Sequence, residues 1–381
     1  MDRHYFDHNA TTPVSPEVFE AMAPVMTEVY GNASSIHHFG QMARQKLDEA
    51  RRQVAALLNA TPEEIVFTSG GTEADNLAIL GVAREGHAIT TAVEHPAVLG
   101  AVAQCATSTI VPVDRSGLAD PDEIRRSLRR DTKLISVMHA NNELGTIQPV
   151  EEIARIAAEA GVVFHSDGVQ AAAKIPVDIR ALGVSMYSVT AHKFYGPKGA
   201  GALFVRKGTP LAPILFGGHH ERDRRPGTEN VAGAAGLGQA AQWAAEHSAT
   251  EAQRLERLRN RLEEAVLESI PDAHINGAGA PRIPNTSNLR FDGIESEALL
   301  IALDLRGFAV SSGSACSSGA SEPSHVLKAI GLTREQARSS LRISLGRSND
   351  ENQVDALVVA LAESVAHLRR IAPHPVEPAY A

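Results

Sequence analysis

The sequence predicts an α/β protein with a large domain, built on a mostly parallel sheet flanked by helices, and a smaller α+β domain. Between residues 64 and 205, short apolar runs alternate with helical patterns, which is typical of parallel sheets covered by helices on both faces. Near residues 245–255 a charged helical pattern begins, and the later strands and helices no longer alternate in this way. We therefore expect a large domain over 14–250, a small domain over 1–13 and 251–371, and a flexible tail over 372–381.

The N-terminal part begins with an extended stretch from Tyr5 to Pro13. Ser15-Pro16-Glu17 then marks the start of a helix, because it supplies an N-cap, a proline at the first helical position and an acid in the first turn. The following pattern predicts a polar helix over 41–58, a strand over 64–68, a turn of Ser, Gly, Gly and Thr, and a helix over 73–80.

The remaining elements follow from apolar runs and helical periodicity. In the large domain we expect strands over 88–93, 133–138, 162–165, 184–189 and 200–205, with helices from 97 and over 150–160. In the small domain we expect a connecting helix over 251–262, strands over 286–291 and 340–345, and helices over 296–305, 323–330 and 351–371.

The composition restricts the class of protein. The 381 residues carry a net charge of −9 with no long basic run, which argues against direct nucleic-acid binding. No apolar run is long enough to cross a membrane and no signal segment begins the chain, so we expect a cytoplasmic protein. Two cysteines are too few for a disulfide scaffold, and the paired histidines lack metal-ligand spacing, so no metal is expected.

Three strand ends carry residues that fit one chemical task. Gly71 and Thr72 open a helix whose free N–H groups suit a phosphate, Asp167 follows a buried strand, and Lys193 lies on a glycine-rich turn. Each has an ordinary alternative, since a lysine on such a turn is most often a solvated charge and an aspartate can cap a turn. A phosphate site, an amine and a carboxylate are together what pyridoxal phosphate requires. With Gln170 three residues after Asp167, the pattern resembles the fold-type-I pyridoxal-phosphate enzymes, in particular their class V aminotransferase branch.

A second informative stretch, 310–323, consists mostly of Ser and Gly and contains Cys316. A cysteine in such a loop has little apolar sequence around it, which leaves a reactive thiol or an incidental exposed one. Cys105 lies in a small-residue helical stretch and is expected to pack there. Arg342 can bind a carboxylate or face solvent from an edge strand. His95, just before a proline, can be part of the site or cap a helix.

Six motifs make the resemblance specific to one group of these enzymes. In chain order they are Glu94-His-Pro96, Asn141-Asn-Glu143, Thr190-Ala-His-Lys193, Arg225-Pro-Gly-Thr-Glu-Asn230, Ser312-Gly-Ser-Ala-Cys316 and Leu341-Arg-Ile-Ser-Leu345. Together they resemble the group I cysteine desulfurases, closest to the NifS/IscS enzymes, over about residues 5–370.

The resemblance implies a role for each matched residue. Lys193 would bind pyridoxal 5′-phosphate covalently, Cys316 would receive the sulfur, and His95 would stack on the ring and help to move protons. Asp167 would pair with the ring nitrogen. The other cofactor contacts would be Gly71, Thr72, Asn142, Gln170, Thr190, His192 and, from the second subunit of a homodimer, Thr228. Arg342 would hold the substrate carboxylate, with Asn32 as a second contact.

The implied reaction converts L-cysteine to L-alanine and leaves a persulfide on Cys316 for a sulfur-acceptor or iron–sulfur scaffold protein. General iron–sulfur assembly, nitrogenase-linked assembly and tRNA thiolation all remain compatible with the sequence. The segment between Arg206 and Phe216 has no arginine where some relatives carry one, and the tail does not resemble the longer docking tails of others. Aminotransferase and selenocysteine lyase activities are alternatives of the same fold, and a catalytically silent sulfur carrier is an alternative of another class.

Overall fold

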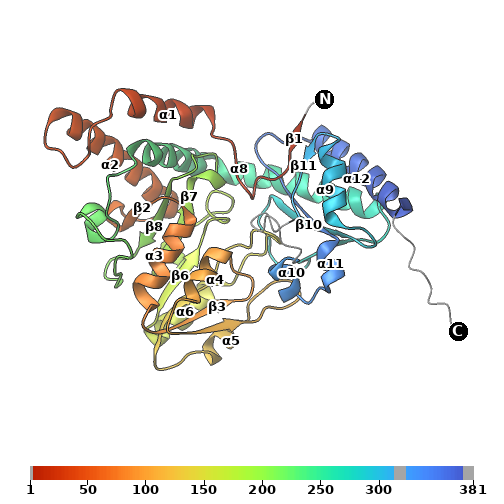
Figure 1. Cartoon of the computed structure of the whole chain (residues 1–381), viewed down its shortest axis with the longest axis horizontal. Coiled ribbons are helices and arrows are strands. Elements are labelled where there is room, and N and C mark those ends of the chain that lie inside the picture. Colours follow the sequence, from red (N-terminus) through yellow and green to blue (C-terminus); the bar gives the residue numbers. More distant parts are fainter. Residues whose placement is uncertain (1–2, 313–322, 372–381) are drawn as a thin grey trace.

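The computed structural model describes residues 3–312 and 323–371. Its centre is a seven-stranded sheet with the strand order β2-β8-β7-β6-β5-β3-β4 (Figure 1). Neighbouring strands from β7 to β4 are parallel, while β8 runs antiparallel to both β7 and β2, so the expectation of a mostly parallel sheet is confirmed. The strands are β2 (Ile65–Thr68), β3 (His87–Thr91), β4 (Thr107–Val111), β5 (Thr132–Ser136), β6 (Val163–Asp167), β7 (Met186–Thr190) and β8 (Gly201–Val205).

Helices cover both faces of this sheet because successive strand residues point to opposite sides. On β3, Ala88 packs with helices α3 and α4, whereas its neighbour Ile89 packs with the cluster that contains α2, α6 and the first half of the long helix α8 (Val231–Ser269). The helices of this part are α1 (Pro16–Thr27), α2 (His38–Leu58), α3 (Gly71–Ala83), α4 (Pro96–Val102), α5 (Pro121–Arg126), α6 (Val150–Ala160) and α7 (Ile179–Leu182).

A smaller unit lies beside the large one, on the right of Figure 1. It contains an antiparallel sheet with the order β12-β10-β9, a parallel pair of β1 and β11, and its own hydrophobic core. Its strands are β1 (His4–Tyr5), β9 (Ala273–Ile275), β10 (Thr286–Phe291), β11 (Phe308–Ala309) and β12 (Ser340–Ser344), and its helices are α9 (Ser296–Asp304), α10 (His325–Ala329), α11 (Arg334–Arg338) and α12 (Glu351–Ile371).

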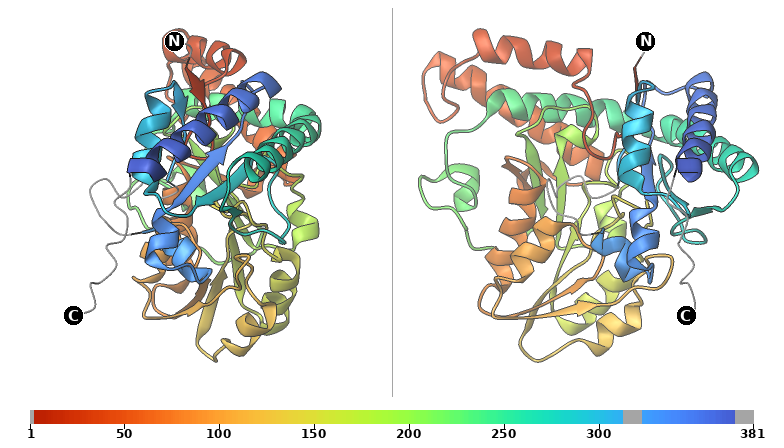
Figure 2. Two further views of the ribbon diagram at one scale, coloured as in Figure 1. Left: turned by 90° about the vertical axis from the view of Figure 1, so that its right-hand side faces the viewer. Right: turned by 45° about the vertical axis from the view of Figure 1, so that its right-hand side comes forward.

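Helix α8 (Val231–Ser269) joins the two parts as one continuous helix of 39 residues. Its first half contributes Leu237 and Ala241 to the core of the large unit, and its second half contributes Leu258 and Leu262 to the core of the small one. The N-terminal strand β1 pairs with β11, so the start of the chain also belongs to the small unit (Figure 2). Within the described ranges, none of the helices is both long and apolar enough to span a bilayer.

Candidate active site

The carboxyl ends of β2, β6 and β7 bring the predicted residues together. Strand β6 ends at Asp167, which lies opposite Ser188 of the neighbouring strand β7. Strand β7 ends at Thr190 and continues into a 3₁₀ turn, Ala191–Lys193, while β2 leads through Gly70 into α3. A parallel sheet places ligands at this edge, so the local geometry agrees with a binding site.

The start of α3 forms a cradle of closely spaced backbone. Gly70 has a φ of 157°, a conformation that favours glycine, and a Cβ on Gly71 would lie 2.9 Å from Cγ2 of Val169. A Cβ on Gly201 would lie 2.7 Å from Cα of Gly70. Thr190 lies beside this turn, with its Oγ1 3.7 Å from the position of a Cβ on Gly70. Such a turn presents N–H groups and the positive end of the helix dipole to an anion.

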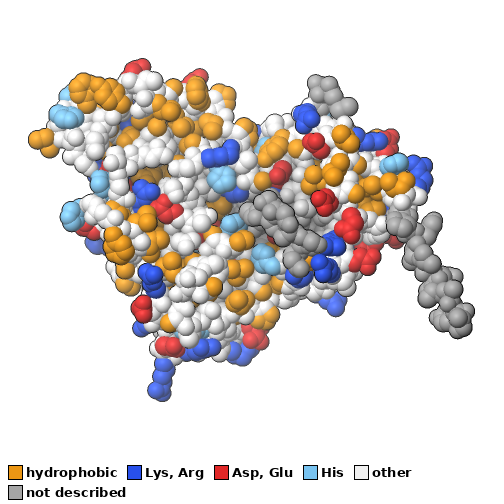
Figure 3. Space-filling model, in the orientation of Figure 1, with side chains coloured by type: hydrophobic (Ala, Val, Ile, Leu, Met, Phe, Trp, Pro, Cys, Tyr) orange, Lys and Arg blue, Asp and Glu red, His pale blue; other side chains and the backbone are white. Residues whose placement is uncertain are grey.

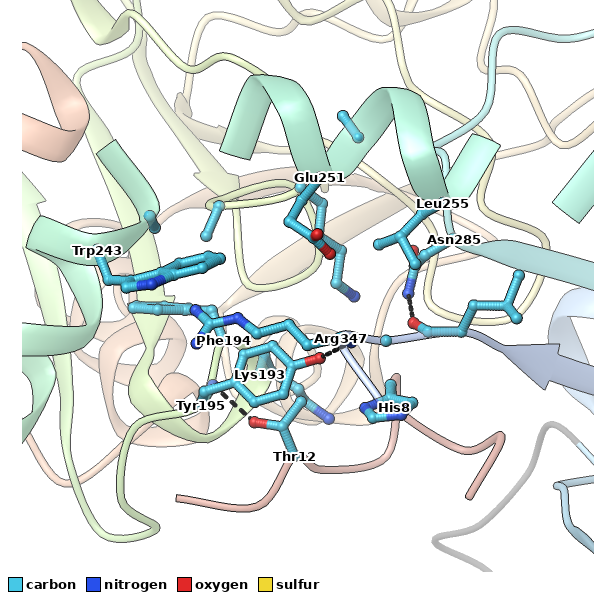
Figure 4. A pocket seen from close by; sticks show the side chains of 16 residues that line it. His8, Thr12, Lys193, Phe194, Tyr195, Trp243, Glu251, Leu255, Asn285 and Arg347 are labelled. Atoms are coloured by element: carbon cyan, nitrogen blue, oxygen red, sulfur yellow. Dashed lines mark hydrogen bonds between the residues drawn. The ribbon is translucent and has the colours of Figure 1, made fainter. Parts of the chain in front are cut away.

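Lys193 points toward the N-terminal stretch of the chain. Its Nζ donates hydrogen bonds to the carbonyl oxygens of Asn9 and Ala10, each at 2.7 Å. The same stretch is tied to the lysine turn, because the backbone N–H of Thr12 donates to the carbonyl of His192. Figure 4 shows Lys193 close to Thr12 and Tyr195 at one wall of a pocket.

An arginine lies between two aromatic side chains that line that pocket. The guanidinium of Arg347 lies 3.1 Å from the ring centre of Trp243 and 4.0 Å from that of Tyr195 (Figure 4). Its backbone N–H donates to the hydroxyl of Tyr195 at 2.6 Å, and its side chain contacts Glu17 at 3.2 Å. This stack connects the segment after β12 with the lysine turn and with α8, so the two units are in contact beside that turn.

Asp167 and His95 are electrostatically linked. Asp167 is buried, and burial raises the pKa of its carboxyl, while His95 and Lys193 act in the opposite direction. Burial lowers the pKa of His95, Lys193 lowers it further, and Asp167 opposes both. His95 also caps α4, because its Nδ1 accepts from the N–H of Ala97 at 3.1 Å, so the capping alternative is correct and does not remove it from the site. A buried carboxylate at this position is most stable beside a cation.

Gln170, His192 and Asn142 surround the same region. The Nε2 of Gln170 donates to the carbonyl of Asn9 at 3.0 Å. The Nδ1 of His192 lies 3.2 Å from Oγ1 of Thr11, and burial together with Lys193 lowers the pKa of this ring to about 4. Asn142 contributes its carbonyl oxygen to the side-chain amide of Asn9 at 3.1 Å.

Arg342 reaches the site from β12 and is 2 % exposed. Its Nη2 pairs with Asp7 at 2.7 Å and its Nη1 donates to the carbonyl of Asn142 at 3.1 Å. Its Nε is buried and has no hydrogen-bond partner within the described part of the chain. Because burying an unpaired donor of a charged group is costly, this atom indicates a place for an anionic ligand.

Two predicted residues lie at the border of this group or away from it. Thr228 is exposed and lines a cavity together with Ser69 and Gly201, which border the α3 cradle. Asn32 is exposed in the segment between α1 and α2, where its Oδ1 accepts from the N–H of Ser34. Helices α1 and α2 extend to the upper left of Figure 1, whereas the small unit lies on the right. Cys316 lies outside the described residues.

The structure adds three polar residues that the sequence did not single out. Asp7 is the ion-pair partner of Arg342, and Asn9 accepts hydrogen bonds from both Lys193 and Gln170. Lys174 is buried and donates to the side chains of Gln170 and Asn9. The sequence contained weak signals for these residues. Asp7 and Asn9 lie just after the first strand, and Lys174 lies four residues after Gln170, the spacing at which helical side chains meet.

The arrangement fits pyridoxal phosphate in three respects. The glycine-lined start of α3 can hold a phosphate, the buried Asp167 can accept a cationic ring nitrogen, and Lys193 can supply the amine. The unpartnered Nε of Arg342 adds a donor for the carboxylate of an amino acid. Within the described residues, no cluster of three or more His, Cys, Asp or Glu side chains could hold a metal.

Comparison with known proteins gives consistent results. The family described as aminotransferase class-V matches residues 4–357. A protein named cysteine desulfurase IscS from Dictyoglomus turgidum is 46 % identical over 382 aligned residues, covering 98 % of this chain and 97 % of the relative. Cysteine desulfurase NifS from Azotobacter vinelandii is 44 % identical, covering 97 % of this chain and 94 % of the relative. A solved structure named NIFS-like protein superposes with a TM-score of 0.89 at 38 % identity and covers 96 % of this chain and 100 % of its own.

Proposed function

The chain belongs to the class V aminotransferase family, and we propose that it is a pyridoxal-phosphate-dependent cysteine desulfurase. The observation that carries this conclusion is the similarity, over almost the whole length of both chains, to proteins named cysteine desulfurase. The geometry supports it, because Lys193, Asp167 and Arg342 meet at one edge of the sheet in positions suited to the cofactor and an amino-acid substrate.

The bound cofactor supplies an electron sink for negative charge that develops at the α-carbon of the substrate. Lys193 would hold the cofactor, and its amine could also carry the α-proton, a role that suits an amine held between two carbonyl oxygens. Asp167 keeps the ring nitrogen positively charged, because its buried carboxylate gains most from a cation in contact. His95, whose pKa burial lowers, is neutral near pH 7 and can accept a proton at the same edge.

Arg342 orients the substrate through its carboxylate. Its guanidinium is already fixed by Asp7 and Asn142, so little side-chain freedom is lost when a ligand binds. The buried, unpartnered Nε can give the carboxylate a charge-assisted hydrogen bond. Asn32 is a second carboxylate contact in this proposal.

The sulfur step uses the thiol of Cys316. Its thiolate attacks the substrate sulfur, so that the S–S bond of a persulfide forms while the C–S bond breaks and its electron pair passes to the substrate carbon. Protonation of that carbon yields L-alanine, and the sum is L-cysteine plus a thiol giving L-alanine plus a persulfide. The persulfide then serves a sulfur-acceptor or iron–sulfur scaffold protein.

A cytoplasmic homodimer completes the proposal. The region of α1 and α2 exposes large apolar side chains, seen at the upper left of Figure 3, among them Phe19, Met26 and Ile36. A patch of this kind is typical of a protein interface. Thr228 is exposed, so in this proposal it is available to the cofactor site of a second copy. Light scattering on the purified protein tests this, and a monomer at micromolar concentration would contradict it.

The two cysteines offer a matched test of the activity. We expect the wild type and Cys105→Ser to release sulfide and alanine from L-cysteine in the presence of a thiol reductant, and Cys316→Ser to release neither. Cys105 is a suitable control because its thiol is half-buried and burial raises its pKa, which leaves it unreactive. Equal release of sulfide and alanine by all three proteins would show that Cys316 is not the nucleophile, whereas a wild type that releases neither product would favour amino-group transfer by the same fold.

A further inference from the structure

Lys174 is a buried amine that the proposed chemistry has not used. It lies in the turn after β6 and is 9 % exposed. Its Nζ donates to Oδ1 of Asn9 at 2.8 Å and to Oε1 of Gln170 at 2.5 Å. Asn9 also accepts a hydrogen bond from Lys193, and Gln170 donates one to Asn9. Lys174 is therefore joined to the site through two amide side chains.

The surroundings of Lys174 favour an uncharged amine. In the described part of the chain no carboxylate forms an ion pair with it. Burial lowers its pKa well below the ordinary value, and the cations Lys193 and Arg342 lower it further. A neutral amine retains two N–H donors, which match the two amide oxygens that it contacts.

These two hydrogen bonds determine the orientation of the Gln170 amide. Because Oε1 accepts from Lys174, the amide must present Nε2 on its other side, where it donates to the carbonyl oxygen of Asn9. That oxygen is also an acceptor for Nζ of Lys193, so the donor end of Gln170 faces the lysine that holds the cofactor. A flipped amide would place Oε1 against the Asn9 carbonyl and leave the donors of Lys174 facing an NH₂ group.

Asn9 is fixed in the same way from several sides. Its Oδ1 accepts from Lys174 and from Asn285, and its Nδ2 donates to Thr286 at 2.8 Å and to the carbonyl of Asn142. These four hydrogen bonds fix the side chain of Asn9. They thereby also fix its backbone carbonyl, which accepts hydrogen bonds from Lys193 and Gln170. Loss of Lys174 therefore removes one hydrogen bond that holds Asn9. It also removes the only side-chain donor, within the described residues, that distinguishes the oxygen end of the Gln170 amide from its nitrogen end.

We propose that Lys174 is a positioning residue, which sets the Gln170 amide so that an N–H donor faces the cofactor end of the site. This inference rests on the proposed function, since it assigns the donor to the anionic ring oxygen of pyridoxal phosphate. A donor stabilises the ionised form of that oxygen, whereas a carbonyl oxygen in its place would repel it. A lysine that merely filled space would affect folding and not the ionisation of the cofactor.

The test is a double-mutant cycle on the cofactor-loaded protein, with the pH midpoint of the visible absorbance band as the readout. We expect Lys174→Met to raise the midpoint by about one pH unit and to weaken cofactor binding about tenfold, as loss of one hydrogen bond to a charged group implies. In a Gln170→Ala background, Lys174→Met should produce little further shift, because the amide that it orients is gone. Lys133→Met, which removes an exposed lysine, is the control and should leave the midpoint unchanged.

The outcomes separate this inference from the proposed function. If the wild type releases alanine from cysteine but Lys174→Met has the wild-type pH midpoint, the positioning role alone is overturned. The same holds if Lys174→Met shifts the midpoint equally in the wild-type and Gln170→Ala backgrounds. A wild type without a visible band overturns both proposals. If Lys174→Met does not fold, Lys174→Gln, which retains an amide donor, takes its place and should give a smaller upward shift that again disappears with Gln170→Ala.

Discussion

Glu94 offers a quantitative test of how burial controls ionisation next to the site. Its carboxyl is fully buried, accepts from Oγ1 of Thr91 at 2.6 Å and accepts from the N–H of Met138 at 3.0 Å on each oxygen. Burial raises its pKa from 4.5 to about 8 in spite of these bonds. The substitution Glu94→Gln keeps the shape and an acceptor oxygen but cannot ionise.

The sign of the effect follows from proton binding. Between pH 4.5 and about 8 the unfolded chain has an ionised Glu94 while the folded protein keeps it protonated, so the folded state binds more protons and its stability falls as the pH rises. The difference of about 3.5 pH units corresponds to about 5 kcal/mol at most. Relative to Glu94→Gln, the wild type should therefore lose up to this free energy of unfolding across the interval, with the loss complete above about pH 8.

Urea unfolding followed by circular dichroism, at intervals from about pH 5 to about pH 9, measures this difference. Glu85→Gln, at an exposed position just before β3, is the control and should run parallel to the wild type. If the Glu94→Gln and wild-type curves are also parallel, the buried carboxyl is ionised throughout, and the argument from burial is wrong.

Three further substitutions test the contacts of the site and of the core. Arg342→Lys should raise the KM for cysteine about 10- to 100-fold, because lysine lacks the planar fork that a carboxylate accepts, and an unchanged KM in steady-state kinetics would contradict the assignment. Asp167→Asn should weaken cofactor binding and lower kcat by about 100-fold or more, and a variant with wild-type kcat would show that the ring nitrogen needs no carboxylate. Arg51→Met removes the cation from a buried ion pair at 2.6 Å and leaves the Glu221 carboxylate with the N–H of Phe67, so it should cost about 3–5 kcal/mol in urea unfolding, and a stability equal to wild type would refute this.

Most long elements of the fold could be predicted because their apolar periodicity is strong. The predicted ranges 150–160, 286–291 and 351–371 coincide with α6, β10 and α12. Strand β4 (Thr107–Val111) was missed because it is an edge strand whose residues are mostly exposed, so it carries little apolar signal.

Part of the candidate site was also predictable from the apolar pattern of the strands. Asp167 and Lys193 lie at the ends of buried strands, where a polar residue stands out from its apolar context. Lys174 and Asn9 act through contacts between segments 165 residues apart, and no local pattern encodes such a pairing. The roles of Thr228 and Asn32 remain predictions, since the proposed contact of Thr228 involves a second copy of the chain and that of Asn32 involves a bound substrate.

The central claim is that sulfur passes from cysteine to Cys316. The most direct measurement is mass spectrometry of the protein after one turnover with L-cysteine in the absence of reductant, together with a count of the alanine released. The account predicts that the peptide containing Cys316 gains the mass of one sulfur atom, with one alanine formed for each persulfide, while the peptide containing Cys105 is unchanged. Alanine formation without sulfur on Cys316 would contradict it.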